Sequence, residues 1–204
     1  VVWMDNRNGN FDIYGYNMTT ETEFPICTNA SSQWMPAISG NTVVWTDKRN
    51  DEGDIYGYDI DTGTEFVICT ATGDQSGAVI SANIVVWTDS RDGNSAVYGY
   101  DLSSDTEFAI CNNDSDLTSP VISGNIVVWH GNCDGVFNGY NLDTKETFTI
   151  PDFTPEELDI SGDIVATRES SDGNHDIYSY NLSSGEKSAV CTARYSQDHP
   201  VISG

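Results

Sequence analysis

The sequence predicts an all-β fold: a five-bladed β-propeller with four antiparallel strands in each blade. One unit of about forty residues occurs five times along the 204-residue chain, and its last copy is split between the two ends. Each unit holds four strand signals rich in β-branched and aromatic residues, and no helical periodicity. A fixed period in this range indicates a repeat architecture, and four antiparallel strands per unit are typical of a propeller blade.

The repeat is clearest in a run that reads Val-Val-Trp. Its third residue falls at Trp3, Trp45, Trp87 and Trp129, and Thr167 stands at the same place in the last copy, so the intervals are 42, 42, 42 and 38 residues. Consecutive apolar residues, rather than alternating ones, are typical of a strand that is covered on both faces. We therefore expect this strand to lie between neighbouring blades.

The second copy shows the other elements of the unit. Strands are expected at residues 36–39, in the run that ends at 46, at 55–58 and at 65–69, with turn sequences such as Asp61-Thr62-Gly63 between them. Gly57, between two tyrosines, leaves room for a bulky neighbour, and we expect the tryptophan of the next blade there.

The two ends of the chain predict how the ring closes. Val1 begins at the second strand of a unit, and residues 199–204 match a first strand, so joining the ends restores an interval of 40 residues. The C-terminal strand should then pair with the N-terminal blade and remove the free sheet edge. We expect one domain, residues 1–204, with blades at 1–28 plus 199–204, 36–70, 78–112, 120–151 and 158–192.

The charge of the chain excludes two classes of partner. It carries 8 Lys and Arg against 32 Asp and Glu, which gives a net charge of −24. Nucleic acid and anionic membrane surfaces are bound by clustered basic residues, so neither is an expected partner. No apolar run approaches the roughly 18 residues of a membrane span, so membrane insertion is not expected either.

Written as VVWTDxRxxxxDIYGYDxxTGTEFxIC…PxISG, the unit resembles the TolB-like (WD-like) β-propeller repeats of archaeal, Methanosarcina-type cell-surface proteins. The resemblance covers the whole chain. It implies an extracellular, cell-surface location, such as a surface layer, and tandem copies in a longer parent chain. The fourth copy departs from the pattern with His130 and Pro151, and the fifth lacks its tryptophan.

Repeated polar and sulfur residues are expected to belong to the scaffold. Four cysteines recur in the fourth strand of a unit, too far apart for disulfides between equivalent positions, so we expect small, buried, unbridged residues: Cys27, Cys69, Cys111 and Cys191. The aspartate before each turn, as in Asp47, should accept hydrogen bonds from loop amides or pair with the nearby arginine, as in Arg49. No cofactor is expected, and the oxygen-rich loops leave calcium as the alternative.

Four sequons lie at strand ends or in loops and fit an envelope protein as glycosylation candidates. They begin at Asn17, Asn29, Asn113 and Asn181.

Residues that break the repeat are the candidates for a ligand site. They lie in or just before the first strands, at the expected mouth of the central channel, where acidic groups from adjacent blades would gather a cation or sugar hydroxyls beside a tryptophan. The ligand-binding candidates are Trp34, Met35, Glu156, Glu157, Asp159, Asp198 and His199.

These observations favour a non-catalytic cell-surface binding or adhesion module. Its variable loops at the channel mouth would bind glycans, envelope proteins or matrix. No nucleophile–base constellation is indicated, and the three histidines are too scattered to predict a metal site. The alternatives are an enzyme, glycoside-hydrolase-like or cation-dependent, with acidic residues at the channel mouth, and a purely structural surface-layer module.

Overall fold

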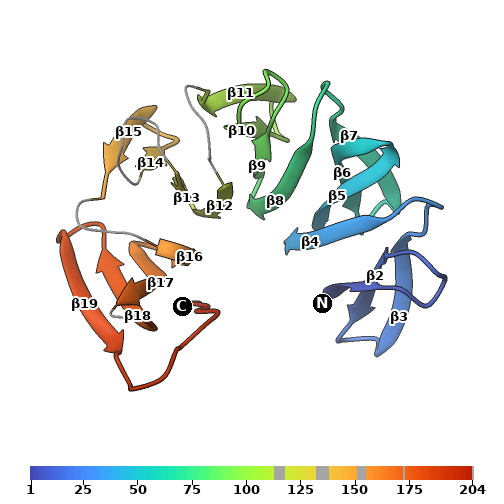
Figure 1. Ribbon diagram of the computed structural model, residues 1–204. Coiled ribbons are helices and arrows are strands. Elements are labelled where there is room, and N and C mark those ends of the chain that lie inside the picture. The colour runs from blue at the N-terminus through green and yellow to red at the C-terminus, as the bar shows by residue number, and fades with distance from the viewer. Residues whose placement is uncertain (113–117, 132–137, 151–154, 172, 204) are drawn as a thin grey trace. The chain divides into compact units, whose positions relative to one another are not determined.

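The fold is described from a computed structural model that covers residues 1–112, 118–131, 138–150, 155–171 and 173–203. The described residues form strands, turns and loops (Figure 1), and no helix among them is long and apolar enough to cross a membrane. The chain divides into two compact units, Val1–Asn112 and Asn113–Gly204.

The first unit contains three antiparallel sheets, each built from strands that follow one another in the sequence. The first sheet has three strands: β1 (Val2–Asp5), β2 (Asp12–Asn17) and β3 (Thr22–Cys27). The second sheet has four: β4 (Gln33–Ser39), β5 (Thr42–Asn50), β6 (Glu52–Asp59) and β7 (Thr64–Cys69). The third sheet also has four: β8 (Gln75–Ser81), β9 (Ile84–Asp89), β10 (Ala96–Asp101) and β11 (Thr106–Cys111).

The second unit contains two antiparallel sheets of the same type, with four strands each. One is built from β12 (Thr118–Ser123), β13 (Ile126–His130), β14 (Asn138–Asn141) and β15 (Glu146–Thr149). The last sheet is built from β16 (Pro155–Ser161), β17 (Ile164–Ser171), β18 (Asn174–Asn181) and β19 (Glu186–Cys191). The all-β prediction is therefore confirmed, and the five sheets agree with five blades.

The first strand of each four-stranded sheet begins earlier than the sequence predicts. β4 starts at Gln33 rather than at residue 36, because the pairing with β5 shifts register between Trp34 and Ala37. Met35, inside this bulge, has a φ of 53°. A bulge interrupts the two-residue alternation on which strand prediction depends, so the residues before it do not read as a strand.

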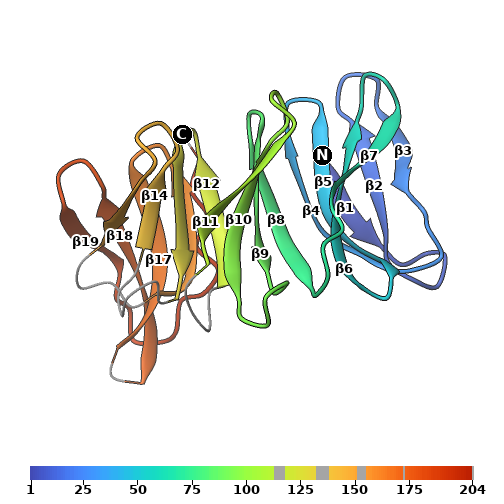
Figure 2. The ribbon, with the colours of Figure 1, turned by 90° about the horizontal axis from the view of Figure 1, so that it is seen from above.

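Within the first unit, successive sheets pack face to face (Figure 2), and Trp45 and Trp87 lie between them. The first sheet places Ile13, Ile26 and Cys27 against Val43, Trp45 and Tyr56 of the second sheet. Trp45 and Trp87 are fully buried, as the unbroken apolar runs predict.

The repeated aspartate and arginine form the scaffold contact expected from the sequence. Asp47 accepts hydrogen bonds from the Trp45 indole at 3.0 Å, from the Arg49 amide at 2.9 Å and from the Arg49 guanidinium at 2.7 Å. The guanidinium also pairs with Glu65 at 2.6 Å and lies 4.0 Å above the ring of Tyr56. Asp89 and Arg91 repeat this arrangement in the third sheet.

The glycine between the tyrosines faces a different neighbour from the one expected. A Cβ on Gly57 would lie 2.4 Å from the ring of Phe66, on the adjacent strand of the same sheet. The expectation of a tryptophan from the next blade is therefore wrong. The two residues are opposite each other in the ladder, so the phenylalanine ring folds over the glycine across the strand pair.

The cysteines agree with the sequence in part. Cys27 and Cys69 are free and buried, and burial raises the pKa of each thiol to about 12. Cys191 is also free. Cys111 is disulfide-bonded, so the expectation of four unbridged cysteines is wrong there. The expectation concerned only disulfides between equivalent positions of adjacent blades.

Candidate functional site

The acidic residues predicted at the channel mouth meet around one arginine in the second unit. Arg168, on β17, lies 2.9 Å from Glu156 and 3.4 Å from Glu157, both on β16. Its other partner is Asp198, in the segment that follows β19, at 2.9 Å. Residues from three parts of the chain thus converge on a single guanidinium.

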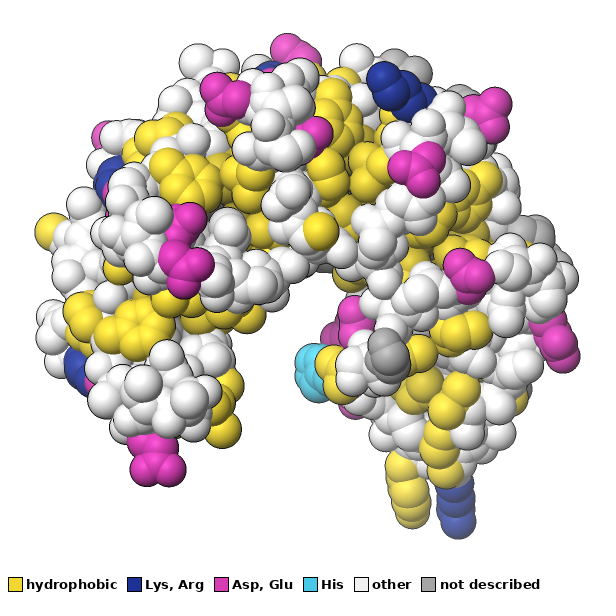
Figure 3. Space-filling view, turned by 180° about the vertical axis from the view of Figure 1, so that it is seen from behind, with side chains coloured by type: hydrophobic (Ala, Val, Ile, Leu, Met, Phe, Trp, Pro, Cys, Tyr) yellow, Lys and Arg dark blue, Asp and Glu magenta, His cyan; other side chains and the backbone are white. Residues whose placement is uncertain are grey.

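Two histidines complete this cluster. His175, on β18, reaches Asp198 through Nδ1 at 3.1 Å and Glu156 through Nε2 at 3.4 Å. His199 lies 3.3 Å from Glu157 through Nδ1. Figure 3 shows a histidine side chain beside acidic ones on one face of the molecule. We call Arg168, Glu156, Glu157, Asp198, His175 and His199 the arginine cluster.

The arginine cluster favours the ionised forms of Arg168 and Asp198. Burial opposes the charge of Arg168, but the hydrogen bond to Asp198 and the charges of Glu157 and Glu156 outweigh it and raise its pKa. Hydrogen bonds from His175 and then from Arg168 hold the pKa of Asp198 below its usual range. The carboxylate therefore stays ionised and accepts hydrogen bonds.

The segment after β19 is held on the last sheet by these carboxylates and by backbone hydrogen bonds. Glu157 accepts a hydrogen bond from the His199 amide at 2.9 Å, and Asp159 accepts one from the Ile202 amide at 2.8 Å. The Gln197 amide donates to the His175 carbonyl at 2.9 Å. Asp159, predicted as a ligand contact, therefore anchors the C-terminal segment.

This segment has the local geometry of an inner strand, although residues 192–203 form no strand. In the first unit, the Gln33 amide donates to the Phe11 carbonyl at 2.7 Å where β4 begins, as Gln197 does to His175. The φ of His199 is 55°, and that of Met35 in the bulge of β4 is 53°. The C-terminal segment thus resembles the start of β4 and lacks only a ladder partner among the described residues.

The other two predicted contacts, Trp34 and Met35, lie on β4 in the first unit. Trp34 is partly buried, and the Lys48 ammonium lies 5.9 Å from its ring centroid. Met35 is exposed, and its amide donates to the Met4 sulfur at 3.3 Å. Both side chains are accessible for contact with a ligand.

Sequence reasoning missed Arg168 and His175. Arg168 replaces the threonine that precedes the aspartate in the regular copies, and it lies opposite Glu157 in the β16–β17 ladder. Repeat-breaking residues were expected only in the first strands and in the loops before them. The arginine breaks the repeat in the second strand, where a charged residue replaces a threonine.

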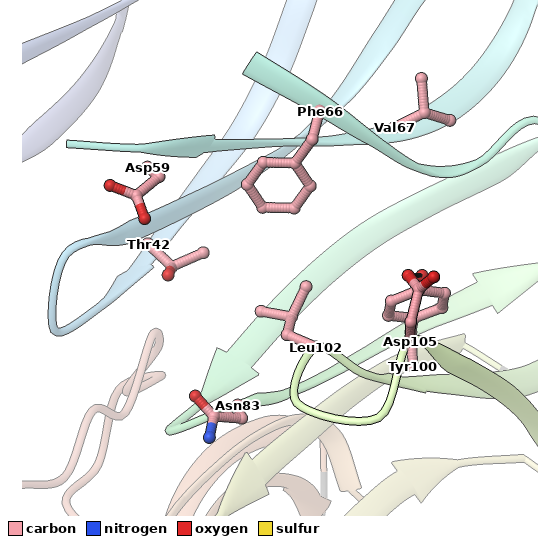
Figure 4. Close-up of a pocket in the computed structure, with 8 residues that line it drawn as sticks. All are labelled: Thr42, Asp59, Phe66, Val67, Asn83, Tyr100, Leu102 and Asp105. Carbon is pink, nitrogen blue, oxygen red and sulfur yellow. Dashed lines mark hydrogen bonds between the residues drawn. The ribbon is translucent and has the colours of Figure 1, made fainter. Parts of the chain in front are cut away.

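A groove with a volume of about 380 Å³ lies between the second and third sheets of the first unit (Figure 4). Phe66, Val67 and Leu102 form its apolar wall, and the Tyr100 hydroxyl donates a hydrogen bond to Asp105 at its rim. That hydrogen bond raises the pKa of Tyr100 to about 12. The other lining residues are Thr42, Asp59 and Asn83.

Among the residues that the structure describes, no group of three or more His, Cys, Asp or Glu side chains could hold a metal ion. In the arginine cluster the guanidinium itself lies between the carboxylates and neutralises them. An arginine also neutralises carboxylates in the loop between β1 and β2, where Arg7 pairs with Asp5 and with Glu23 of β3, each at 2.5 Å.

The sequons stay predictions of glycosylation. Asn17 is exposed, and its Oδ1 accepts a hydrogen bond from the Thr19 amide at 2.9 Å. Asn29 and Asn181 are partly buried and accept similar hydrogen bonds, from Ser31 at 3.2 Å and from Ser183 at 3.0 Å. Asn113 lies outside the described residues.

Comparison with known proteins shows the fold and no closer relationship. No protein-family model matches the chain. No curated protein matches it either. Similar solved structures are numerous, and TolB from Acinetobacter baumannii is one of them, at 17% identity and a TM-score of 0.66. That alignment covers 91% of this chain and 50% of TolB, so the chain spans about half the length of that protein.

Two further neighbours are a chain of a protein complex and an enzyme. A chain of the nidogen–laminin complex aligns at 14% identity and a TM-score of 0.63, over 87% of this chain and 70% of that one. Oligogalacturonate lyase from Vibrio parahaemolyticus aligns at 15% identity and a TM-score of 0.69, over 93% of this chain and 61% of the lyase. The chain therefore has a TolB-like β-propeller fold, which occurs in enzymes and in other proteins.

Proposed function

We propose that the protein is a non-catalytic binding module of the cell surface. It binds an envelope protein or glycan through its arginine cluster and the loops beside it. The observation that carries this proposal is the convergence of Glu156, Glu157 and Asp198 on Arg168. These residues interrupt the repeat, whereas the repeated charges stabilise contacts between sheets.

The chemistry of the cluster suits recognition of a polar partner. Its carboxylates are partly exposed, and they accept hydrogen bonds from hydroxyl and amide donors. One structural neighbour is part of a nidogen–laminin complex, so the fold is compatible with a protein partner. The resemblance of the repeat to archaeal surface proteins supports a cell-surface location and tandem copies of the propeller in a longer chain.

The same chemistry bears on the glycosidase alternative at Asp198. A carboxylic acid that protonates a leaving group needs a raised pKa, so that it carries a proton near neutral pH. The pKa of Asp198 is lowered instead, by His175 and Arg168. Asp198 is therefore unsuited to the role of that acid.

We also propose that the five sheets close into one ring, in which residues 199–204 complete the first sheet. The first sheet has three strands where the others have four. The C-terminal segment, with its left-handed His199, has the geometry of the missing inner strand. In the register of β4 and β5, Val201 would lie opposite Val2.

The test of the binding proposal is a screen of the intact chain on glycan arrays, with calorimetry against hits and against calcium. The cluster variant Glu156→Gln/Asp198→Asn should lose at least about tenfold in affinity for a hit, because its charge-assisted hydrogen bonds are removed. The matched control, Asp59→Asn/Asp105→Asn in the groove of the first unit, should keep the wild-type affinity.

Two outcomes would contradict the proposal. Turnover of a glycoside in the screen would establish the enzymatic alternative. Silence of the wild type towards glycans, calcium and the envelope proteins with which it is co-expressed would favour the purely structural module.

A further inference from the structure

The groove between the second and third sheets of the first unit has a carboxylate at each end. Asp59 lies at one end and Asp105 at the other (Figure 4). Phe66 and Leu102 lie between them and pack against the buried core that joins the two sheets. The lining residues that the structure describes include no lysine or arginine. The groove therefore has an apolar middle and two anionic ends.

Each of these carboxylates is held in place through one of its oxygens. Oδ1 of Asp59 accepts a hydrogen bond from the Thr62 amide at 2.9 Å, and Oδ1 of Asp105 accepts one from the Tyr100 hydroxyl. Oδ2 of both residues has no hydrogen bond or ion pair within the described part of the chain. The first oxygen thus orients the carboxylate, and the second is available to a ligand.

Both carboxylates break the repeat of the first unit. Asn17 stands in the first sheet where Asp59 stands in the second. Gly63 stands in the second sheet where Asp105 stands in the third. The contact between the first and second sheets therefore lacks the two acids, so they are not needed to pack one sheet on the next.

Asn83, at the same end of the groove as Asp59, is freed by another change in the repeat (Figure 4). In the second sheet, the equivalent Asn41 donates a hydrogen bond to Asp61 at 2.6 Å. Ser103 replaces that aspartate in the third sheet, and the Asn83 side chain has no hydrogen-bond partner among the described residues. Its amide oxygen is therefore available as a second acceptor at this end.

We propose that the groove binds an aliphatic diamine, with one ammonium group at Asp59 and Asn83 and the other at Asp105. Each ammonium group donates up to three hydrogen bonds, and those to a carboxylate are strengthened by charge. The methylene chain lies along Phe66 and Leu102, where it removes apolar surface from water. This site is separate from the arginine cluster and does not depend on the function proposed for it.

The test is calorimetry of the intact chain with a series of linear diamines, from diaminopropane to diaminooctane. The affinity should peak at one chain length, because the two carboxylates are held at a fixed separation. A monoamine of that length should bind at least about tenfold more weakly, since it reaches only one carboxylate. Salt at about 0.15 M screens charges more than about 8 Å apart, which limits unspecific attraction to the acidic chain.

Two variants remove one end each, with residues that the repeat already uses there. Asp59→Asn and Asp105→Gly should each weaken the best diamine by at least about tenfold and remove the preference for its length. The φ of Asp105 is 55° and that of Gly63 is 65°, so glycine fits this turn without strain. Both variants should therefore keep the wild-type Tm in the absence of a diamine.

The matched control is Asp101→Asn. Asp101 stands in the third sheet where Asp59 stands in the second, but it does not line the groove. It also removes one negative charge, so unspecific attraction of cations changes by the same amount as in Asp59→Asn. The control should keep the wild-type affinity and the preferred chain length.

Three outcomes would overturn the proposal. Affinity that does not vary with chain length, and that falls equally in Asp101→Asn, would show counterion binding to an acidic chain only. A monoamine that binds as tightly as the diamine would show that one end acts alone. Binding of a neutral polyol that depends on Asp59 and Asp105, without binding of any diamine, would assign the groove to uncharged ligands.

Discussion

The second sheet (β4–β7) and the last sheet (β16–β19) neutralise a buried acid with charges placed on different strands. In the second sheet, Asp47 pairs with Arg49, two residues further along β5, and Arg49 also pairs with Glu65 on β7. In the last sheet, Glu169 takes the place of Asp47, and Lys187 takes the place of Glu65. Lys187 pairs with Glu169 at 2.7 Å and lies 4.6 Å from the ring of Tyr178.

The difference shows what the repeat must retain. A cation lies over the tyrosine ring and beside the buried acid in both sheets, whichever strand supplies it. In the last sheet the acid keeps a buried oxygen, Oε1 of Glu169, without a hydrogen-bond partner among the described residues, whereas both oxygens of Asp47 accept hydrogen bonds. We therefore expect the last sheet to tolerate substitutions that the second sheet does not.

The tryptophan position should show the largest effect. Trp45→Ala should lower the free energy of unfolding by about 3–5 kcal/mol, because it leaves a cavity between two sheets. Thr167, fully buried at the same place in the last sheet, donates one hydrogen bond to the Glu157 carbonyl. Thr167→Ala should cost about 1 kcal/mol. Chemical denaturation measures both, and equal losses would contradict the comparison.

The buried acid should show the next largest effect, and a pH dependence. Burial opposes ionisation of Asp47, but hydrogen bonds from Arg49 and Trp45 outweigh it and lower its pKa. Its stabilisation is therefore complete above the unfolded pKa of about 3.9 and is lost as the pH falls through the lower folded value. Asp47→Asn should cost about 2–3 kcal/mol at pH 7.

Thermal unfolding between pH 2 and pH 7 measures this dependence. The Tm of Asp47→Asn should fall less steeply with acid than that of the wild type, and the difference between the two should vanish at the acid end. Glu169→Gln is the control in the last sheet, and its cost at pH 7 should be smaller. A variant whose deficit stays constant across the pH range would show that Asp47 acts through its shape rather than its charge.

The glycine position should show the smallest of the three effects. Gly57→Ala places a methyl group against the Phe66 ring, and the resulting shift should cost about 1–3 kcal/mol. In the last sheet the equivalent ladder pair is Ser179 and Ser188, so Ser179→Ala should be close to neutral. A double-mutant cycle with Phe66→Ala measures the coupling, and a cost unchanged in that background would exclude the ring as the cause.

Much of the fold could be predicted from the sequence because each copy states the same elements again. The buried tryptophans, the turn sequences and the Asp47–Arg49 pair depend on residues close in the chain, so their pattern is visible without coordinates. The strand starts were predicted about three residues late, because the bulge at Met35 hides the alternation. The predicted neighbour of Gly57 was wrong, because the residue opposite it depends on the register between two strands.

The candidate site could be predicted only as a set of acidic residues. That Glu156, Glu157 and Asp198 face one arginine follows from the β16–β17 register and from the path of the chain after β19. Arg168 lies on the second strand of its unit, where the repeated residues are expected to stabilise the scaffold. It was therefore not predicted as a site residue. The anchoring role of Asp159 also depends on the path of the chain after β19, because its partner is a backbone amide of the C-terminal segment.

The buried thiols of Cys27 and Cys69 have a consequence for how the protein reacts with oxidants. Oxidants and disulfides attack the thiolate, and with a pKa of about 12 only about one thiol in 10⁵ is ionised at pH 7. These sulfurs are therefore slow to react even in an oxygenated medium. Burial between the sheets therefore protects both thiols from oxidation.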